Sequence, residues 1–181
     1  MRQRLAANVA LWLLSYATAF LVFHVARFTG AARFKFNPKV PPVKMILAEV
    51  CRSFGGILVL TAYQCFALAK VVASPAADAA APGILEQAKW MAVVALWADA
   101  HFYVTHRFMH TVPALYRLVH KTHHLSRNTD PWSGLSMHPL EHLVYFSAVF
   151  LTLLVPGGVP FWVTNLLCIA LTVYPIPAHI G

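Results

Sequence analysis

The stretch ILEQAKWMAVVALWADAHFYVTHRFMH, residues 84–110, starts as an apolar run and ends among histidines. This stretch predicts a third membrane-spanning helix that starts near Ile84 and runs through Trp90 and Trp97 into Asp99 and the first histidines. Asp99 and the histidines after it are costly in hydrocarbon. We therefore expect one helix whose far end leaves the apolar region and carries polar side chains to the membrane surface.

Two more apolar stretches lie upstream, at residues 9–28 and 45–73. Each is long enough to cross roughly 30 Å of hydrocarbon at about 1.5 Å per residue. A basic connection with three prolines separates them, and an Ala-rich, almost uncharged link follows at residues 74–83. Because basic loops favour the cytoplasmic side, we expect the basic connection there, together with the basic segment after His101.

The chain downstream of the histidines contains two shorter apolar stretches, residues 142–155 and 161–173. At about 1.5 Å per residue, the first is short for a full crossing. Between them, Pro-Gly-Gly-Val-Pro at residues 156–160 forces a turn. The pattern predicts a hairpin that returns His179 to the histidine-rich side.

The composition is typical of a protein whose solvent is lipid. Hydrophobic residues make up 59% of the 181 residues and charged residues only 11%, which does not fit an ordinary soluble surface. A net charge of +8 suits either nucleic acid or an anionic membrane face, and the hydropathy favours the membrane, so we expect no nucleic-acid partner. The predicted fold class is all-α: an integral membrane helical bundle with a histidine-rich metal site at the cytosolic face.

Eight of the ten histidines fall between His101 and His142. His106 and His110 are four residues apart, so a helix places both imidazoles on one face. The same reasoning applies to the next group, His120, His123 and His124. Imidazole binds iron, zinc, copper and nickel, and no thiolate accompanies these groups to select structural zinc. The spacing predicts a metal site.

Three further residues are candidates for the surroundings of that metal site. Glu141 suits a carboxylate that accepts the free N–H of a ligand histidine and fixes its tautomer. His138 precedes a proline, which favours extended backbone, so a ligand role and a hydrogen bond in a turn are equally good interpretations. Asp99 lies near the predicted membrane boundary, where a metal-bound histidine would relieve the cost of its charge, and a solvated helix end is the alternative.

These motifs resemble the fatty acid hydroxylase/sterol desaturase superfamily. The resemblance rests on His-Arg-Phe-Met-His at 106–110, His-Lys-Thr-His-His at 120–124 and His-Pro-Leu-Glu at 138–141, with Asp99 and Tyr103 ahead of them, and it covers about residues 98–181. It implies an integral membrane enzyme with two iron ions at the cytoplasmic face. Such an enzyme uses O2 and external electrons to hydroxylate or desaturate a lipid of the sterol or fatty acyl type.

The resemblance also implies ligands, partners and organisation. By motif matching, the metal ligands are His106, His110, His120, His123, His124 and His179. The electrons would come from a separate donor protein of the cytochrome b5 or ferredoxin type with an NAD(P)H-linked reductase, in the endoplasmic reticulum if the chain is eukaryotic and the inner membrane if it is bacterial. Residues 1–83 would form the N-terminal transmembrane helices and linker, and residues 84–181 the hydroxylase-like domain. Because the family has a further histidine cluster, we expect this chain to be incomplete at its C-terminus.

A second class of function remains open at this point: a non-enzymatic membrane metalloprotein. A haem electron carrier would place paired histidines on facing transmembrane helices, whereas here the histidines crowd at one helix end. A divalent-metal transporter would line the membrane midplane with ionisable ligands, and only His24, Glu49 and Arg52 come near that description.

Overall fold

The computed structural model describes residues 2–28, 41–71 and 83–179, and within these ranges it contains helices and no strand. The predicted all-α fold class is therefore confirmed. The basic connection and the Ala-rich link lie almost entirely outside the described residues. The elements, with η for 3-10 helices, are α1 (Arg2–Phe28), α2 (Val43–Val71), α3 (Ile84–Thr111), α4 (Pro113–Leu118), η3 (His120–Leu125), η4 (Pro131–Ser133), α5 (Pro139–Phe146), η5 (Ser147–Leu153), α6 (Phe161–Val173) and α7 (Pro175–Ala178).

Helix α2 is the one described helix that is long and apolar enough to cross a membrane, judged by length and composition. Helices α1 and α3 are of similar length, but they do not meet both conditions over the described residues. The prediction of three full crossings is thus met only by α2. The difference at α3 follows from its charged side chains, among them Glu86, Lys89 and Asp99.

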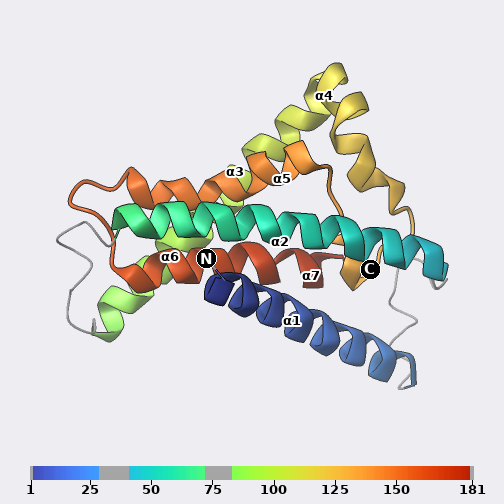
Figure 1. The fold of residues 1–181 in the computed structure, drawn as a ribbon, viewed down its shortest axis with the longest axis horizontal. Helices are drawn as coiled ribbons and strands as arrows, with labels where there is room; N and C mark the ends of the chain where they lie inside the picture. The colour runs from blue at the N-terminus through green and yellow to red at the C-terminus, as the bar shows by residue number, and fades with distance from the viewer. Residues whose placement is uncertain (1, 29–40, 72–82, 180–181) are drawn as a thin grey trace.

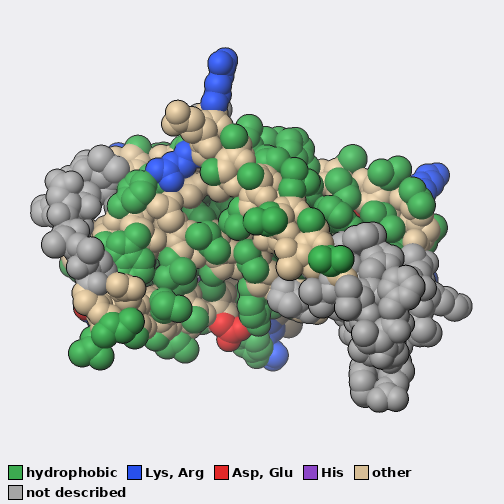
Figure 2. All heavy atoms as spheres, turned by 90° about the horizontal axis from the view of Figure 1, so that it is seen from below, with side chains coloured by type: hydrophobic (Ala, Val, Ile, Leu, Met, Phe, Trp, Pro, Cys, Tyr) green, Lys and Arg blue, Asp and Glu red, His purple; other side chains and the backbone are tan. Residues whose placement is uncertain are grey.

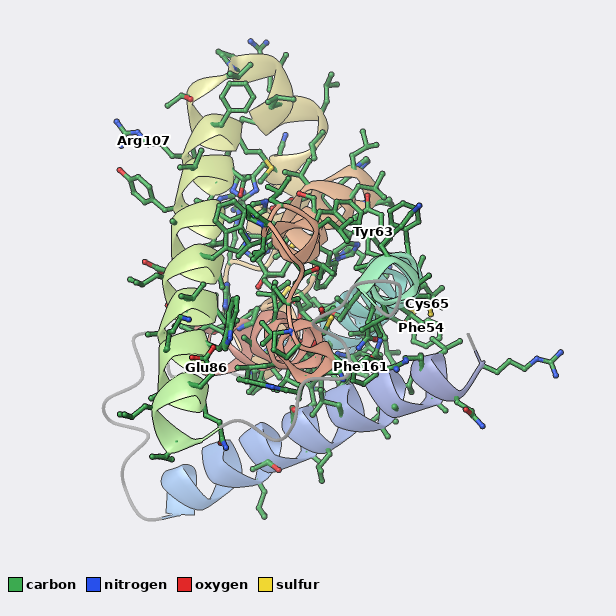
Figure 3. The ribbon with its side chains drawn as sticks, turned by 90° about the vertical axis from the view of Figure 1, so that its left-hand side faces the viewer. Phe54, Tyr63, Cys65, Glu86, Arg107 and Phe161 are labelled. Atoms are coloured by element: carbon green, nitrogen blue, oxygen red, sulfur yellow. The ribbon has the colours of Figure 1, made fainter. Side chains whose placement is uncertain are left out.

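Helices α2, α5 and α6 lie side by side, and α1 packs against α2 and α6 (Figure 1). Helix α3 runs across the bundle, in contact with α5 and α6 (Figure 3). Its C-terminal end and α4 project beyond the other helices (Figure 1). Helix α3 ends at Thr111 because Pro113 disfavours helical backbone at the preceding residue, Val112, which is extended.

The core forms where α1, α2, α5 and α6 meet. Trp12 and Tyr16 of α1 are buried against α2 and η4, and Ile57, Phe146 and Leu167 are fully buried from three other helices. Gly56 of α2 allows a close approach to α5, because a Cβ atom there would lie 2.7 Å from Nε2 of His142. These contacts hold α5, which carries Glu141, against α2.

A chain of side-chain hydrogen bonds crosses the same bundle. Nδ2 of Asn8 donates to Oγ1 of Thr61 and Oε1 of Gln64, each at 2.9 Å. Nε2 of Gln64 then donates to Oδ1 of Asn165 at 3.1 Å, and Arg4 donates to the same oxygen at 3.0 Å. Amide pairs of this kind set the register of helices that otherwise share only apolar contacts.

The predicted hairpin downstream of the histidines is confirmed. Gly157 and Gly158 have φ of 80° and 86°, a left-handed backbone that glycine adopts without steric cost, and they reverse the chain between η5 and α6. Helix α6 and the short α7 then return the chain, and the ring centroid of His179 lies 5.3 Å from that of His123.

Candidate metal centre

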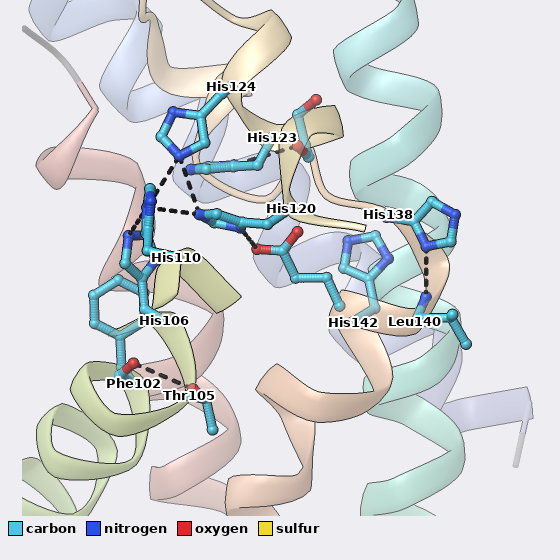
Figure 4. Close-up of polar contacts among 12 residues, drawn as sticks. Phe102, Thr105, His106, His110, His120, His123, His124, His138, Leu140 and His142 are labelled. Atoms are coloured by element: carbon cyan, nitrogen blue, oxygen red, sulfur yellow. Dashed lines mark hydrogen bonds and ion pairs between the residues drawn. The ribbon is translucent and has the colours of Figure 1, made fainter. Parts of the chain in front are cut away.

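Two chain segments meet to form the site. The last turns of α3 carry His106 and His110 on one face, as the helical spacing predicts, with their Nε2 atoms 3.1 Å apart. Helix α4 then reverses the chain, and η3 brings His120 and His124 back against α3 (Figure 4). The segment 120–125 is a 3-10 helix and not the α-helix that the sequence suggested.

Four imidazole nitrogens converge in this four-histidine cluster, which consists of His106, His110, His120 and His124. Nε2 of His110 lies 3.1 Å from that of His106, 3.0 Å from that of His120 and 3.2 Å from that of His124. The Nε2 atoms of His120 and His124 are 3.0 Å apart. The ligand atoms of His106, His110 and His120 all lie within 4.8 Å of one another.

Hydrogen bonds among these nitrogens cannot explain the arrangement. One Nε2 atom carries either one hydrogen or one lone pair, so His110 can donate to at most one of its three neighbours. A metal ion bound by His106, His110 and His120 explains why these three nitrogens converge, because metal–nitrogen bonds of about 2.0–2.1 Å place adjacent ligand nitrogens roughly 3.0–3.4 Å apart. His124 lies beside this group, next to His110 and His120. The residues present therefore fit a first-row metal ion such as iron.

Glu141 holds His120 in the orientation that a ligand needs. Nδ1 of His120 donates to Oε1 of Glu141 at 2.7 Å, and the two side chains are 0% and 2% exposed. Since Nδ1 carries the hydrogen, Nε2 of His120 keeps a lone pair, and this is the atom that faces His110 and His124. The proline at the start of α5, Pro139, favours the helix that positions Glu141.

The surroundings keep the imidazoles neutral. Burial, and after it the neighbouring histidines, lower the pKa of His106 to about 4. Burial also lowers the pKa of His123 to about 3, with the next contributions from His179 and His120. The pKa values of His110 and His124 are lowered by partial burial and by His120. At neutral pH these side chains are free bases, the form that binds a metal ion.

A second pair of histidines, His123 and His179, lies beside the cluster. The rings of His123 and His120 are 5.6 Å apart between centroids and nearly parallel. His123 and His179 are 5.3 Å apart at an interplanar angle of 78°. Thus five of the six predicted ligands lie in or next to one site. The sixth, His179, lies against His123.

Two predicted residues lie elsewhere. His138 is the N-cap of α5, where its Nδ1 accepts a hydrogen bond from the backbone N–H of Leu140 at 3.2 Å (Figure 4). Asp99 is seven residues before His106 on α3, which is about 10 Å along a helix. It lines an apolar cavity of about 140 Å³ between α3, α5 and α6, together with Phe102 and Tyr145. The structure does not bring either residue to the four nitrogens.

Two aromatic side chains at the site were not predicted. Phe102 lies 5.0 Å from the ring of His106, and Tyr116 lies 5.6 Å and 5.8 Å from the rings of His110 and His124. Phe102 is four residues before His106, so helical spacing could have identified it. Tyr116 comes from α4, whose direction the sequence does not reveal.

Comparison with known proteins places all these residues within one family match. The model of the fatty acid hydroxylase family matches residues 91–181, half of the 181-residue chain. No solved structure shows a significant match to the chain. The matched region contains the four-histidine cluster, His123, Glu141 and His179. The chain therefore belongs to the fatty acid hydroxylase family, a family of helical membrane proteins.

Proposed function

We propose that this chain is a multi-pass, non-haem di-iron oxidoreductase that hydroxylates or desaturates a lipid. The family supports a membrane enzyme that oxidises lipids. The proposal that the chain binds iron depends on one observation. Nε2 of His110 contacts three other imidazole nitrogens, and one hydrogen cannot satisfy all three contacts. Bound iron would supply the oxidation of an unactivated C–H bond with O2 and two electrons, which no side chain can perform alone.

The residues of this chain would divide the work of holding two ions. His106, His110 and His120 would hold one ion, with His124 beside them, and His123 and His179 would contribute to the second. Glu141 would keep the Nδ1 hydrogen of His120 in place. Phe102 and Tyr145, which are in edge-to-face contact, would separate the imidazoles from the apolar cavity and exclude water from it.

The rim of the site suits an acidic electron-donor protein of the cytochrome b5 or ferredoxin type. Arg107, Arg117 and Lys121 are exposed on the projecting end of α3, on α4 and on η3, next to the exposed His110 and His124. Complementary charge would speed the encounter with such a donor. A basic rim also agrees with a position on the cytosolic face.

The nitrogen spacing does not favour a haem electron carrier. Two axial histidines on opposite sides of a porphyrin iron would have their nitrogens about 4 Å apart, twice a metal–nitrogen bond. The observed separations of 3.0–3.2 Å within the cluster leave no room for a ring plane between them.

The experiment compares two histidine substitutions in the full chain, purified in detergent and supplied with a reduced electron-donor protein of the ferredoxin type. His110→Ala removes the nitrogen that contacts three others, so we expect loss of iron from the four-histidine cluster and loss of lipid-dependent O2 consumption. His138→Ala is the matched control, because this histidine only caps α5. Iron content by metal analysis and lipid products by mass spectrometry provide the readouts. A wild-type protein without iron, or a His110→Ala protein with full iron, contradicts the proposal.

A further inference from the structure

Both histidines of the second pair are oriented by backbone carbonyl groups. Nδ1 of His123 donates to the carbonyl oxygen of Ser136 at 3.3 Å, and Nδ1 of His179 donates to that of Pro175 at 2.7 Å. A carbonyl oxygen only accepts hydrogen bonds, so Nδ1 carries the hydrogen in both rings. The lone pair is then on Nε2 in both, and the two rings lie within 5.3 Å of each other.

One segment of chain, residues 130–137, fixes the positions of both carbonyl groups, those of Ser136 and Pro175. It contains Ser136, the acceptor for His123. It also contains Gly134, on which the peptide of Pro175 packs so closely that a Cβ atom at Gly134 would lie 2.5 Å from the Pro175 oxygen and 2.8 Å from its carbonyl carbon. Neither distance is compatible with a side chain, so only glycine permits the Pro175 oxygen to stay where His179 meets it.

The segment is itself held firmly. Asp130 and Ser133 form a capping box, in which the backbone N–H of Asp130 donates to Oγ of Ser133 at 3.3 Å. In addition, the Trp132 N–H donates to Oδ1 of Asp130 at 2.8 Å, and Oγ of Ser133 donates to the Asp130 carbonyl oxygen at 2.7 Å. The ring of Trp132 stacks on Tyr16 of α1 with centroids 4.2 Å apart. Nε of Arg52 on α2 donates to Oγ of Ser136 at 2.8 Å. A displacement at Gly134 is therefore passed to α7, because the segment has little freedom to give way.

We propose that residues 130–137 position His123 and His179 for a second metal ion, and that Gly134 is the positioning residue for His179. This inference rests on the proposed function, since it concerns the segment that orients the ligands of the second ion. Gly134 touches no imidazole and would act only through the Pro175 carbonyl group. Its contribution is to the orientation of a ligand and not to the reacting atoms.

The test titrates Fe(II) under anaerobic conditions into the metal-free full chain and measures the number of ions bound and their dissociation constants. Gly134→Ala should weaken the second ion roughly 10- to 100-fold, the range seen when the groups that orient a ligand are removed, and should leave the first ion unchanged. His179→Ala should show the same pattern. Gly55→Ala is the matched control, because a Cβ atom there meets nothing within 4 Å, and it should bind both ions as the wild type does.

The outcomes separate the two proposals. A wild type that binds no iron contradicts the proposed function. A wild type that binds two ions together with a Gly134→Ala protein that binds both equally tightly contradicts only the role of Gly134. A second measurement needs no Gly134 variant: nitrogen chemical shifts of 15N-histidine in the metal-free wild type, assigned with His123→Ala and His179→Ala, should show the Nδ1–H tautomer at both positions. An Nε2–H tautomer at either one overturns the inference.

Discussion

At the scale of single residues, the site depends on which nitrogen of each imidazole carries its hydrogen. The acceptors differ in kind: His120 donates to the Glu141 carboxylate, whereas His123 and His179 donate to backbone carbonyl groups. A carboxylate holds the Nδ1 hydrogen more strongly than a neutral carbonyl group does, because the acceptor is charged. Among the side chains that bind no metal themselves, we therefore expect Glu141 to be the one whose removal disturbs the four-histidine cluster most.

Substitution of Glu141 tests this directly. Glu141→Ala should lower iron affinity roughly 10- to 100-fold and should also lower stability by about 1–3 kcal/mol, because the buried Nδ1–H of His120 loses its acceptor. Competition with a chelator and thermal unfolding measure the two effects. Glu86→Ala is the control, since Glu86 is an exposed glutamate near the start of the same helix as the cluster. Wild-type iron affinity in Glu141→Ala would contradict the role assigned to this carboxylate.

The lowered histidine pKa values predict how the stability of the metal-free protein depends on pH. His106 and His123 have folded-state pKa values of about 4 and about 3, against an ordinary value of 6.5. Between pH 6.5 and about 4 the unfolded chain therefore binds protons that the folded chain does not, so stability falls as the pH is lowered through this range. Above pH 6.5 these two groups cause no pH dependence.

Unfolding midpoints followed by tryptophan fluorescence at pH 7.5, 6.0 and 5.0 measure this effect. His123→Gln should reduce the decrease between pH 7.5 and pH 5.0, because one of the titrating groups is gone. An equal decrease in the wild type and His123→Gln would show that other groups dominate the titration.

The sequence predicted several of these residue-level features but not the others. The helical spacing of His106 and His110 and the capacity of Glu141 to orient a histidine follow from side-chain chemistry alone. The carbonyl groups of Ser136 and Pro175 leave no trace in a sequence, because every residue has a carbonyl group. The sequence left two interpretations of His138 for a similar reason. A histidine that caps a helix and a histidine that binds a metal ion cannot be distinguished in a sequence, because the difference lies in the position of the neighbouring segments.

At the scale of helices, apolar runs and prolines predicted the positions of α2, α3, α6 and the turn before α6. They did not predict the 3-10 helices η3 and η5, because the choice between α and 3-10 backbone depends on packing against other elements. One close packing contact joins α2 and α5. Gly56 is the residue that allows it, since the ring of His142 occupies the space where a Cβ atom would be.

Adjacent glycines on α2 make a matched pair of substitutions. Gly56→Ala should destabilise the protein by about 1–3 kcal/mol through overpacking against His142. Gly55→Ala, where nothing lies within 4 Å, should be neutral or stabilise the helix by up to about 1 kcal/mol. Denaturant or thermal unfolding of the two variants in the same detergent gives the comparison. Equal stability of the two variants would mean that α2 and α5 do not approach as closely as the structure has them.

At the scale of the whole molecule, the helices present large apolar side chains outward. Leu47, Leu58 and Phe66 on α2 and Leu96 on α3 are between 44% and 72% exposed, and hydrophobic side chains are spread over much of the described part of the face in Figure 2. A surface of this kind is unfavourable in water and favourable in lipid. The N-terminal helices share their core with α5 and α6, while the division of the chain at residue 83 stays a prediction.

The free cysteines allow the membrane position of α2 to be tested. Cys51 is exposed on α2, whereas Cys168 is buried, and Cys51 lies eight residues after the helix begins, about 12 Å along its axis. If α2 crosses the bilayer, Cys51 faces hydrocarbon, from which a charged maleimide is excluded because transfer of an unpaired charge is very unfavourable. In a chain with Cys65→Ala and Cys168→Ala, Cys51 should not be labelled in vesicles and should be labelled fully after addition of SDS.

A second single-cysteine chain supplies the reference rate for that labelling. Leu118→Cys, with the three native cysteines replaced by alanine, places the thiol on α4, where Leu118 is 74% exposed on the part of the chain that projects from the bundle (Figure 1). Vesicles opened by freezing and thawing admit the reagent to both faces, so this thiol should react readily whichever way the protein is inserted. Labelling of Cys51 at the rate of Leu118→Cys would place α2 in water and would require another occupant for its apolar face. Protection of Cys51 alone would put the histidine centre at the edge of the bilayer, where an apolar chain in the membrane and a soluble electron donor can both reach it.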